Sequence, residues 1–242
     1  MFLNERIRGN DLPAKTVCLT FDDGPGDTTS AEDPGPRTLQ LAQFLADRNI
    51  RATFFMVGKF VEQHRDIVWR VSELGHLIGN HTYDHPNLTS LHDKSRDFAV
   101  NQITRTERLL RDFPTFVRLF RPPQGAWSES LATELNSADE TKSCIGPIHW
   151  DIPTPQNDDK TADWRFWTDG RSAKECAEAY ILDLKATDHG IVLMHDGLYE
   201  EAPRSRMYPL QMVQIVVDWL QGNRYQFIAL DSVPQVIRAQ DC

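Results

Sequence analysis

Residues 16–57, TVCLTFDDGPGDTTSAEDPGPRTLQLAQFLADRNIRATFFMV, decide the fold class. Thr16–Phe21 is an apolar run of the length of a buried strand, and Thr53–Val57 is a second such run. Between them, Arg37–Arg48 places leucine, alanine and phenylalanine at roughly helical spacing. The order strand, helix, strand predicts parallel strands covered by helices.

The rest of the chain repeats this alternation. Further strands are expected at His76–Gly79, Val117–Phe120, Cys144–Trp150, Ile191–Met194 and Gln226–Ala229, and further helices at Val61–Leu74, Leu91–Arg111, Ser128–Leu135, Ala173–Lys185, Tyr208–Leu220 and from Ser232. About seven strand-helix units result, and no linker divides them. We therefore predict one α/β domain over residues 1–242, an irregular or incomplete (β/α) barrel. A flat doubly wound sheet is the alternative.

The composition is that of an acidic globular protein. The chain has 26 Lys and Arg against 35 Asp and Glu, a net charge of −9, and 40% of its residues are hydrophobic. This charge disfavours nucleic acid and anionic membranes as partners. No apolar run could span a bilayer, and residues 1–15 lack the apolar centre of a signal peptide. We expect a cytoplasmic protein or an exported one that has been trimmed; the oligomeric state is left open.

The four cysteines, at positions 18, 144, 176 and 242, are widely spaced and form no Cys-x-x-Cys pair. We therefore expect buried thiols and no zinc-thiolate site. A disulfide is the alternative for an exported protein.

Unusual polar residues directly follow the predicted strands. They are Asp22 and Asp23 after the first strand, Asn80 and His81 after the third, Arg121 after the fourth, Asp151 after the fifth, and His195 and Asp196 after the sixth. In α/β barrels the chemistry lies at the carboxyl ends of the strands, so these side chains are the candidates for a functional site.

Asp23, His81 and His85 are a ligand set suited to zinc, which commonly keeps three protein ligands and one open position in catalytic sites. His81 and His85 are four residues apart in HTYDHP, and on a helical turn both imidazoles would face one ion. Neighbouring side chains on an extended strand point opposite ways, so Asp22 could act on a water while Asp23 binds the metal. A plain turn and two unrelated surface histidines are the alternatives.

Two further residues are suited to catalysis. His195 could be a general acid, because histidine titrates near working pH. Arg121 precedes two prolines and a glycine in FRPPQG, which predicts a rigid loop able to present a backbone N–H to an oxyanion. The alternatives are a histidine hydrogen-bonded in a turn and a loop that is simply rigid.

Four motifs occur together in one order. They are LTFDDGP at 19–25, HTYDHP at 81–86, FRPPQG at 120–125 and IVLMHDG at 191–197. The set closely resembles the polysaccharide deacetylases of the NodB-homology group, carbohydrate esterase family four, from about Lys15 to Asp231. The resemblance implies a metal-dependent hydrolase that removes N-acetyl groups from N-acetylglucosamine-type glycans and releases acetate.

The resemblance also implies roles for the motif residues. Asp23, His81 and His85 match the metal ligands, with zinc expected and cobalt or nickel as alternatives. Asp22 matches the general base and His195 the general acid.

Four further residues have roles that rest on the same resemblance. Arg121 matches the arginine that orients the base, and Gln124 the residue whose backbone N–H holds the oxyanion. Many relatives carry an aromatic residue at that position. Leu193 matches the residue that lines the acetyl-methyl pocket, and Trp150 is expected to contact the substrate.

A further family motif, which begins here at Trp150, departs from the family pattern. Relatives show Trp, Asp and Asp-Trp within a few residues, whereas here Ile152–Ala162 separates Trp150 from Asp163-Trp164. Asp163 is the expected partner of His195; Asp159 and Asp151 are the alternatives. We expect Gly26–Pro36 and Pro153–Ala162 to be surface loops beside the substrate groove.

Two other functions are open on the sequence. One is another amide or imide hydrolase on the same fold; relatives of that kind generally lack the full metal triad. The other is a non-catalytic glycan-binding module, which would show a damaged base or triad. The base and the triad are both intact here, which favours the deacetylase.

Overall fold

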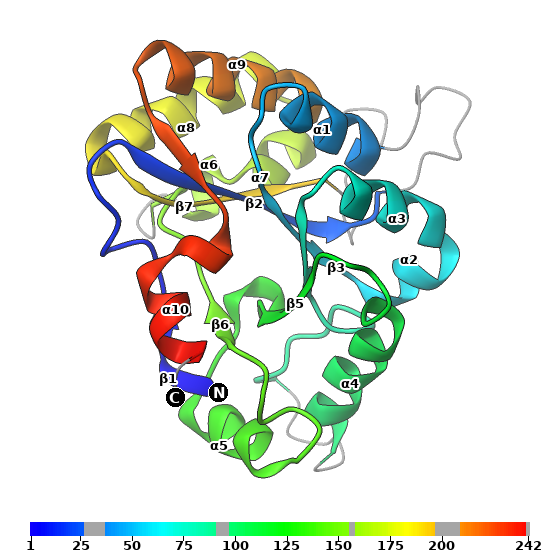
Figure 1. The fold of residues 1–242 in the computed structure, drawn as a ribbon. Helices are drawn as coiled ribbons and strands as arrows, with labels where there is room; N and C mark the ends of the chain where they lie inside the picture. Colours follow the sequence, from blue (N-terminus) through cyan, green and yellow to red (C-terminus); the bar gives the residue numbers. More distant parts are fainter. Residues whose placement is uncertain (27–36, 91–96, 155–157, 197–208, 241–242) are drawn as a thin grey trace.

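The structure, a computed structural model, describes residues 1–26, 37–90, 97–154, 158–196 and 209–240. Strands and helices alternate along these ranges (Figure 1). The strands are β1 Phe2–Ile7, β2 Thr16–Gly24, β3 Thr53–Met56, β4 Leu77–Asn80, β5 Phe116–Phe120, β6 Gly146–Ile148, β7 Gly190–His195 and β8 Gln226–Ile228. The helices are α1 Arg37–Ala46, α2 Gly58–Gln63, α3 Arg65–Glu73, α4 Phe98–Leu110, α5 Glu129–Ser137, α6 Asp158–Thr161, α7 Asp163–Thr168, α8 Ala173–Thr187, α9 Pro209–Gly222 and α10 Pro234–Gln240, with 3-10 turns η1 Pro123–Gly125 and η3 Leu230–Ser232.

The strands form a curled parallel sheet. Its hydrogen-bonded order is β5-β4-β3-β2-β7, and β8 pairs with the start of β2. β1 and β6 pair separately, also in parallel. Single parallel bridges, Leu119 to Ile145 and Ile152 to Val192, connect the chain around β6 to β5 and β7. The expected irregular (β/α) barrel is therefore confirmed, and the sheet is not flat and doubly wound.

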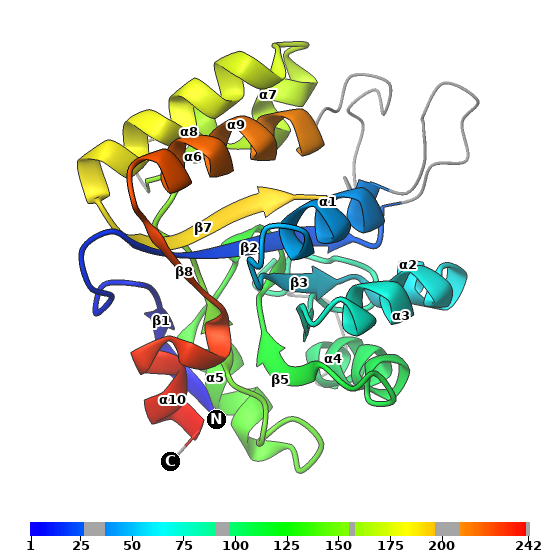
Figure 2. The same ribbon diagram turned by 45° about the horizontal axis from the view of Figure 1, so that its top comes forward.

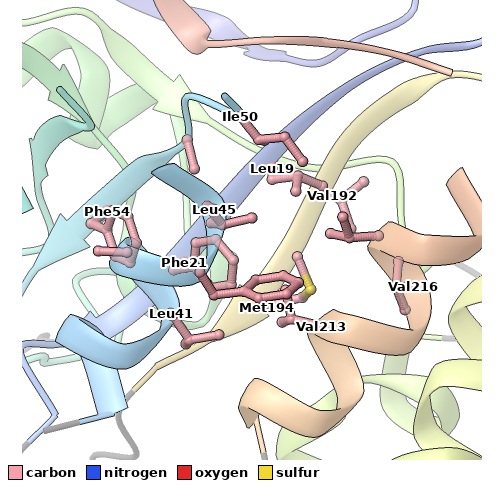
Figure 3. Close-up of a cluster of buried hydrophobic side chains, with 14 of the residues drawn as sticks. Leu19, Phe21, Leu41, Leu45, Ile50, Phe54, Val192, Met194, Val213 and Val216 are labelled. Atoms are coloured by element: carbon pink, nitrogen blue, oxygen red, sulfur yellow. The ribbon is translucent and has the colours of Figure 1, made fainter. Parts of the chain in front are cut away.

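Strand β2 is the centre of the barrel, and all nine of its residues are buried. Its neighbours are β3 and β8 on one side and β7 on the other. Because both faces of such a strand are buried, its sequence is a nearly continuous apolar run and does not alternate between apolar and polar residues. Helices α1 and α9 cover its outer face (Figure 2). The core between these layers contains Leu19, Phe21, Leu41, Leu45, Ile50, Phe54, Val192, Met194, Val213 and Val216 (Figure 3).

The expected strands and helices are present in the described parts of the chain, with a difference at Val61–Leu74 and with three elements that were not predicted, β1, α6 and α7. The stretch Val61–Leu74 belongs to two helices, α2 and α3, because His64 between them is not helical (φ −130°, ψ 47°). The N-terminal strand β1 was not predicted, because its middle is exposed and only Phe2 and Ile7 are buried. The expected helix starts at 91–96 and 208 lie outside the described residues.

The segment Pro153–Ala162, expected to be a surface loop, contains the short helix α6, and residues 155–157 of it lie outside the described residues. Lys160 is exposed, whereas Pro153 and Ala162 at the two ends are buried. The expected loop Gly26–Pro36 lies outside the described residues apart from Gly26, which is buried.

Two composition-based expectations concern cysteines and membranes. Cys18, Cys144 and Cys176 are buried free thiols, as expected, and Cys242 lies outside the described residues. In the described ranges, no helix has the length and apolar character needed to cross a bilayer.

Candidate active site

The carboxyl ends of neighbouring strands bring the predicted polar residues together. Asp22 and Asp23 lie near the end of β2, and His195 is the last residue of β7. His81 directly follows β4, and Arg121 directly follows β5. Because these strands are parallel, their carboxyl ends meet at one edge of the sheet, where a site is expected in α/β barrels.

Strand β2 is irregular at Asp23, and this changes where the two carboxylates point. The register with β3 shifts between Asp22 and Gly24, and Asp23 has a φ of 73°. Both carboxylates therefore approach the same imidazole: His81 Nε2 lies 3.7 Å from Asp22 Oδ2 and 3.4 Å from Asp23 Oδ1. The expectation that the two side chains point opposite ways is wrong, because the bulge re-aims them. Positive φ in a residue other than glycine is uncommon and often marks a functional constraint.

Asp23, His81 and His85 offer three ligand atoms to one point. These atoms all lie within 4.8 Å of one another, and Asp23 Oδ1 is 3.1 Å from His85 Nε2. Asp23 Oδ1 is buried and, apart from these two imidazole nitrogens, has no hydrogen-bond partner in the described part of the chain. Buried acceptors are normally satisfied, so an oxygen that faces only two imidazole nitrogens fits a divalent cation such as zinc.

Neighbouring groups prepare the triad for a cation. His81 Nδ1 lies 2.7 Å from the Arg121 carbonyl oxygen, so Nδ1 carries the proton and Nε2 has a free lone pair. Burial opposes ionisation of Asp23, but His85 and His81 outweigh it and hold the Asp23 pKa well below its usual range. Asp23 is therefore in the carboxylate form that metal binding requires.

The loop that carries both imidazoles is not the helical turn that was expected. Residues 81–87 form no helix, and Thr82 and His85 have positive φ values of 67° and 57°. Both imidazoles still reach Asp23, because the backbone itself turns them inward.

Arg121 holds Asp22 from one side. The Arg121 side chain is fully buried, and its Nη1 donates to Asp22 Oδ1 at 2.7 Å and to Thr20 Oγ1 at 2.8 Å. Nη2 donates to the His149 carbonyl at 3.1 Å and Nε to the Ile148 carbonyl at 3.3 Å. The guanidinium is thus locked in place, and Asp22 Oδ2 is left facing His81.

Asp163 holds His195 from the other side. Asp163 is fully buried at the start of α7; its Oδ1 lies 2.6 Å from His195 Nδ1, and its Oδ2 accepts the His195 backbone N–H at 2.7 Å. Burial alone would lower the pKa of His195, but the Asp163 carboxylate outweighs it and, helped by Asp23 and Asp22, raises the pKa to about 10. His195 is therefore cationic at neutral pH.

Asp151 and Asp159 were the alternative partners for His195. Asp151 Oδ2 accepts the backbone N–H groups of Gly9 at 2.7 Å and Ile191 at 2.8 Å, which fastens the N-terminal segment to the barrel. The side chain of Asp159 lies outside the described residues.

Gln124 lies on the η1 turn with its side chain exposed and a φ of 57°. Its side-chain oxygen accepts from Asn87 Nδ2 at 2.9 Å, and within the described ranges no hydrogen bond takes its backbone N–H. Gly125 beside it has a φ of 61°, and a Cβ there would lie 2.9 Å from the Trp150 ring, so glycine is required.

Trp150 and Leu193 were expected to contact substrate. The half-buried Trp150 ring stacks on His149 with centroids 5.1 Å apart. Leu193 is buried on β7, in register with Thr20 of β2, two residues before Asp22 along that strand.

No role was predicted from the sequence for Asp196 or Thr38. Asp196 is fully buried, its backbone N–H donates to the Asp22 carbonyl at 3.2 Å, and burial raises its pKa to about 7. The Thr38 hydroxyl donates to Asp196 Oδ2 and accepts the Gly26 N–H at 2.6 Å. This network supports the turn after Asp22 and Asp23. Nothing in the sequence around Thr38 indicated it, because the contact is long-range.

The comparisons with known proteins agree on one family. A family model for polysaccharide deacetylases matches residues 9–142. The chain is 31% identical over 240 residues to the peptidoglycan-N-acetylglucosamine deacetylase PgdA of Listeria monocytogenes, covering 96% of this chain and 42% of that protein. It is 32% identical over 184 residues to a chitooligosaccharide deacetylase of Azorhizobium caulinodans, covering 75% of this chain and 74% of that protein.

A solved structure is also similar. The Bc1960 peptidoglycan N-acetylglucosamine deacetylase matches with a TM-score of 0.70 and 27% identity, covering 92% of this chain and 89% of that one. The present chain spans less than half the length of the Listeria protein. The family match covers more than half of the chain and includes all three residues of the buried triad, and the chain therefore belongs to the polysaccharide deacetylase family, the NodB-homology group.

Proposed function

We propose that this protein is a metal-dependent hydrolase that removes N-acetyl groups from N-acetylglucosamine-type glycans and releases acetate. One observation carries the proposal: an Asp-His-His triad lies beside a carboxylate held by an arginine, and that carboxylate is in register with a histidine held by a second carboxylate. Such a pair of positioned groups around a metal supplies a base and an acid for hydrolysis. The named activities of the relatives indicate the substrate class.

Asp23, His81 and His85 would hold the metal. Two imidazoles and one carboxylate favour zinc, and cobalt or nickel also accept this set. When bound, the metal polarises the acetamide carbonyl and lowers the pKa of a water.

Asp22 is the general base in this proposal. Its Oδ2 takes a proton from the attacking water, while Arg121 holds Oδ1 and orients the carboxylate. The hydroxyl oxygen then bonds to the acetyl carbon. The Gln124 N–H, which has no partner within the described residues, donates to the oxygen that becomes negative.

His195 is the general acid. It donates its proton to the nitrogen as the carbon–nitrogen bond breaks, so that acetate and a free amino sugar leave. Asp163 keeps His195 charged and oriented until that step. Leu193 would line the space for the acetyl methyl group, and Trp150 would contact the sugar.

The test is an acetate-release screen with metal restored, over chitin oligomers, peptidoglycan, acetylated xylan and a bacterial exopolysaccharide. The proposal expects release from at least one N-acetylated glycan, and none from the matched Asp22→Asn variant. Release from a cyclic imide or another non-glycan amide alone would favour an amide or imide hydrolase. Glycan binding without release from any substrate would favour a binding module.

A further inference from the structure

The loop between the two histidine ligands is held by side chains. All four backbone N–H groups of residues 82–85 donate to side-chain oxygens: Thr82 to Asn80 Oδ1 (2.9 Å), Tyr83 and Asp84 to Gln102 Oε1 (2.9 and 2.8 Å), and His85 to Thr82 Oγ1 (3.0 Å). Two of the three acceptor residues, Asn80 and Thr82, belong to the end of β4 and to the loop itself. Gln102 is the acceptor that comes from another element, α4.

The loop needs such support because its backbone is strained. Thr82 and His85 have positive φ values, and for the β-branched Thr82 this is a genuine outlier. A strained conformation persists only where the surroundings hold it. Water cannot replace Gln102 easily, because the Gln102 side chain is 93% buried and the N–H of Tyr83 is buried with it.

The Gln102 amide is itself fixed in one orientation. Its oxygen receives two N–H groups, and its Nε2 donates to Asp84 Oδ2 at 3.1 Å. Helix α4 is attached to the same region by a second bond, from Asn80 Nδ2 to the Ile103 carbonyl at 2.9 Å. The helix and the ligand loop therefore form one hydrogen-bonded unit.

We propose that Gln102 is a positioning residue for the metal triad. By holding the N–H groups of Tyr83 and Asp84, it fixes the separation and direction of His81 and His85, so that both imidazoles meet Asp23. Gln102 then sets metal affinity without touching the metal. The inference rests on the proposed function only in that the triad must bind a divalent cation.

The test compares zinc dissociation constants, measured on metal-free protein by competition with a chromophoric chelator. Gln102→Met keeps size and helix propensity but removes the acceptor, and should weaken zinc binding by about 10–100-fold, the usual effect of losing an outer partner of a ligand. Gln102→Glu combined with Asp84→Asn keeps an acceptor for both N–H groups and a donor facing it, and should recover most of the affinity. The visible spectrum of the cobalt form should change in the Met variant, because the ligand geometry changes.

Two controls separate positioning from general stability. Asn101→Ala changes the neighbouring exposed position of α4 and should leave zinc affinity unchanged. Leu110→Ala, at the buried far end of α4, should lower the melting temperature with little effect on zinc affinity. If Leu110→Ala weakens zinc binding as much as Gln102→Met does, general destabilisation is the cause and the inference is wrong.

The remaining outcomes are also decisive. Zinc affinity of Gln102→Met equal to wild type overturns the inference and leaves the proposed function standing. Should that variant not fold, Gln102→Asn, whose shorter amide cannot reach both N–H groups, takes its place with the same expectation and the same refutation. If wild type itself binds no zinc, the metal-dependent function is wrong, and the role of Gln102 falls with it.

Discussion

Replacing Asp163 by asparagine removes the charge that keeps His195 protonated while leaving a side chain of the same shape. The carboxylate lies 2.6 Å from His195 Nδ1 and is fully buried, so little solvent screens it. An opposite charge at such a distance shifts a pKa by about 1–3 units. Without it, burial would pull the His195 pKa down from about 10. The change corresponds to about 1.4–4 kcal/mol of lost preference for the imidazolium.

The assay is the pH dependence of kcat/KM on an N-acetylglucosamine oligomer. If His195 must be protonated to act, activity falls on the basic side as pH rises through its pKa. The Asp163→Asn variant should therefore lose activity at a pH about 1–3 units lower than wild type. The control is Asp151→Asn, because Asp151 bonds to Gly9 and Ile191 and not to His195. A basic limb that stays in place in Asp163→Asn would refute the reasoning and move the partner to another carboxylate.

Three further predictions follow from the same site. His195→Ala should lose far more activity on N-acetyl sugars than on an activated phenyl acetate, whose leaving group needs no proton; equal losses would argue against the acid role. Asp22→Asn should keep its metal and lose about 10²–10⁴-fold in kcat; loss of metal by elemental analysis would make Asp22 a ligand. Because the pKa of His195 is raised in the folded protein, its ion pair with Asp163 contributes stability that is fully present below about pH 6.5 and is lost as the pH rises towards 10. The melting temperature should therefore fall over that window in wild type, and fall less in Asp163→Asn. An equal fall in both proteins would contradict the ion pair.

The fold and the composition of the site could be predicted from sequence because local patterns carry them. The apolar run of β2 is buried along its whole length, and the polar residues after it stand where barrel strands end. The partner of His195 could be named only with alternatives. Asp163 reaches the site through α7, a helix of six residues that gives no periodic signal.

The local geometry of the ligands could not be predicted from the sequence, for a different reason. Spacing alone predicted a helical turn for His81 and His85 and opposed directions for Asp22 and Asp23, and both expectations are wrong. The loop that contains Thr82 and His85, both with positive φ, is held by a contact with a distant element, Gln102 on α4. Tertiary hydrogen bonds of this kind override local preference and leave no local pattern in the sequence.

The most direct test of the account is a zinc titration of metal-free protein with acetate release as the readout. The account predicts that release from an N-acetylglucosamine oligomer rises with added zinc and levels off at one equivalent, while His81→Ala neither binds that equivalent nor releases acetate. Acetate release that does not depend on zinc, or metal content that is the same in wild type and His81→Ala, would contradict the assignment of Asp23, His81 and His85 as the catalytic metal site.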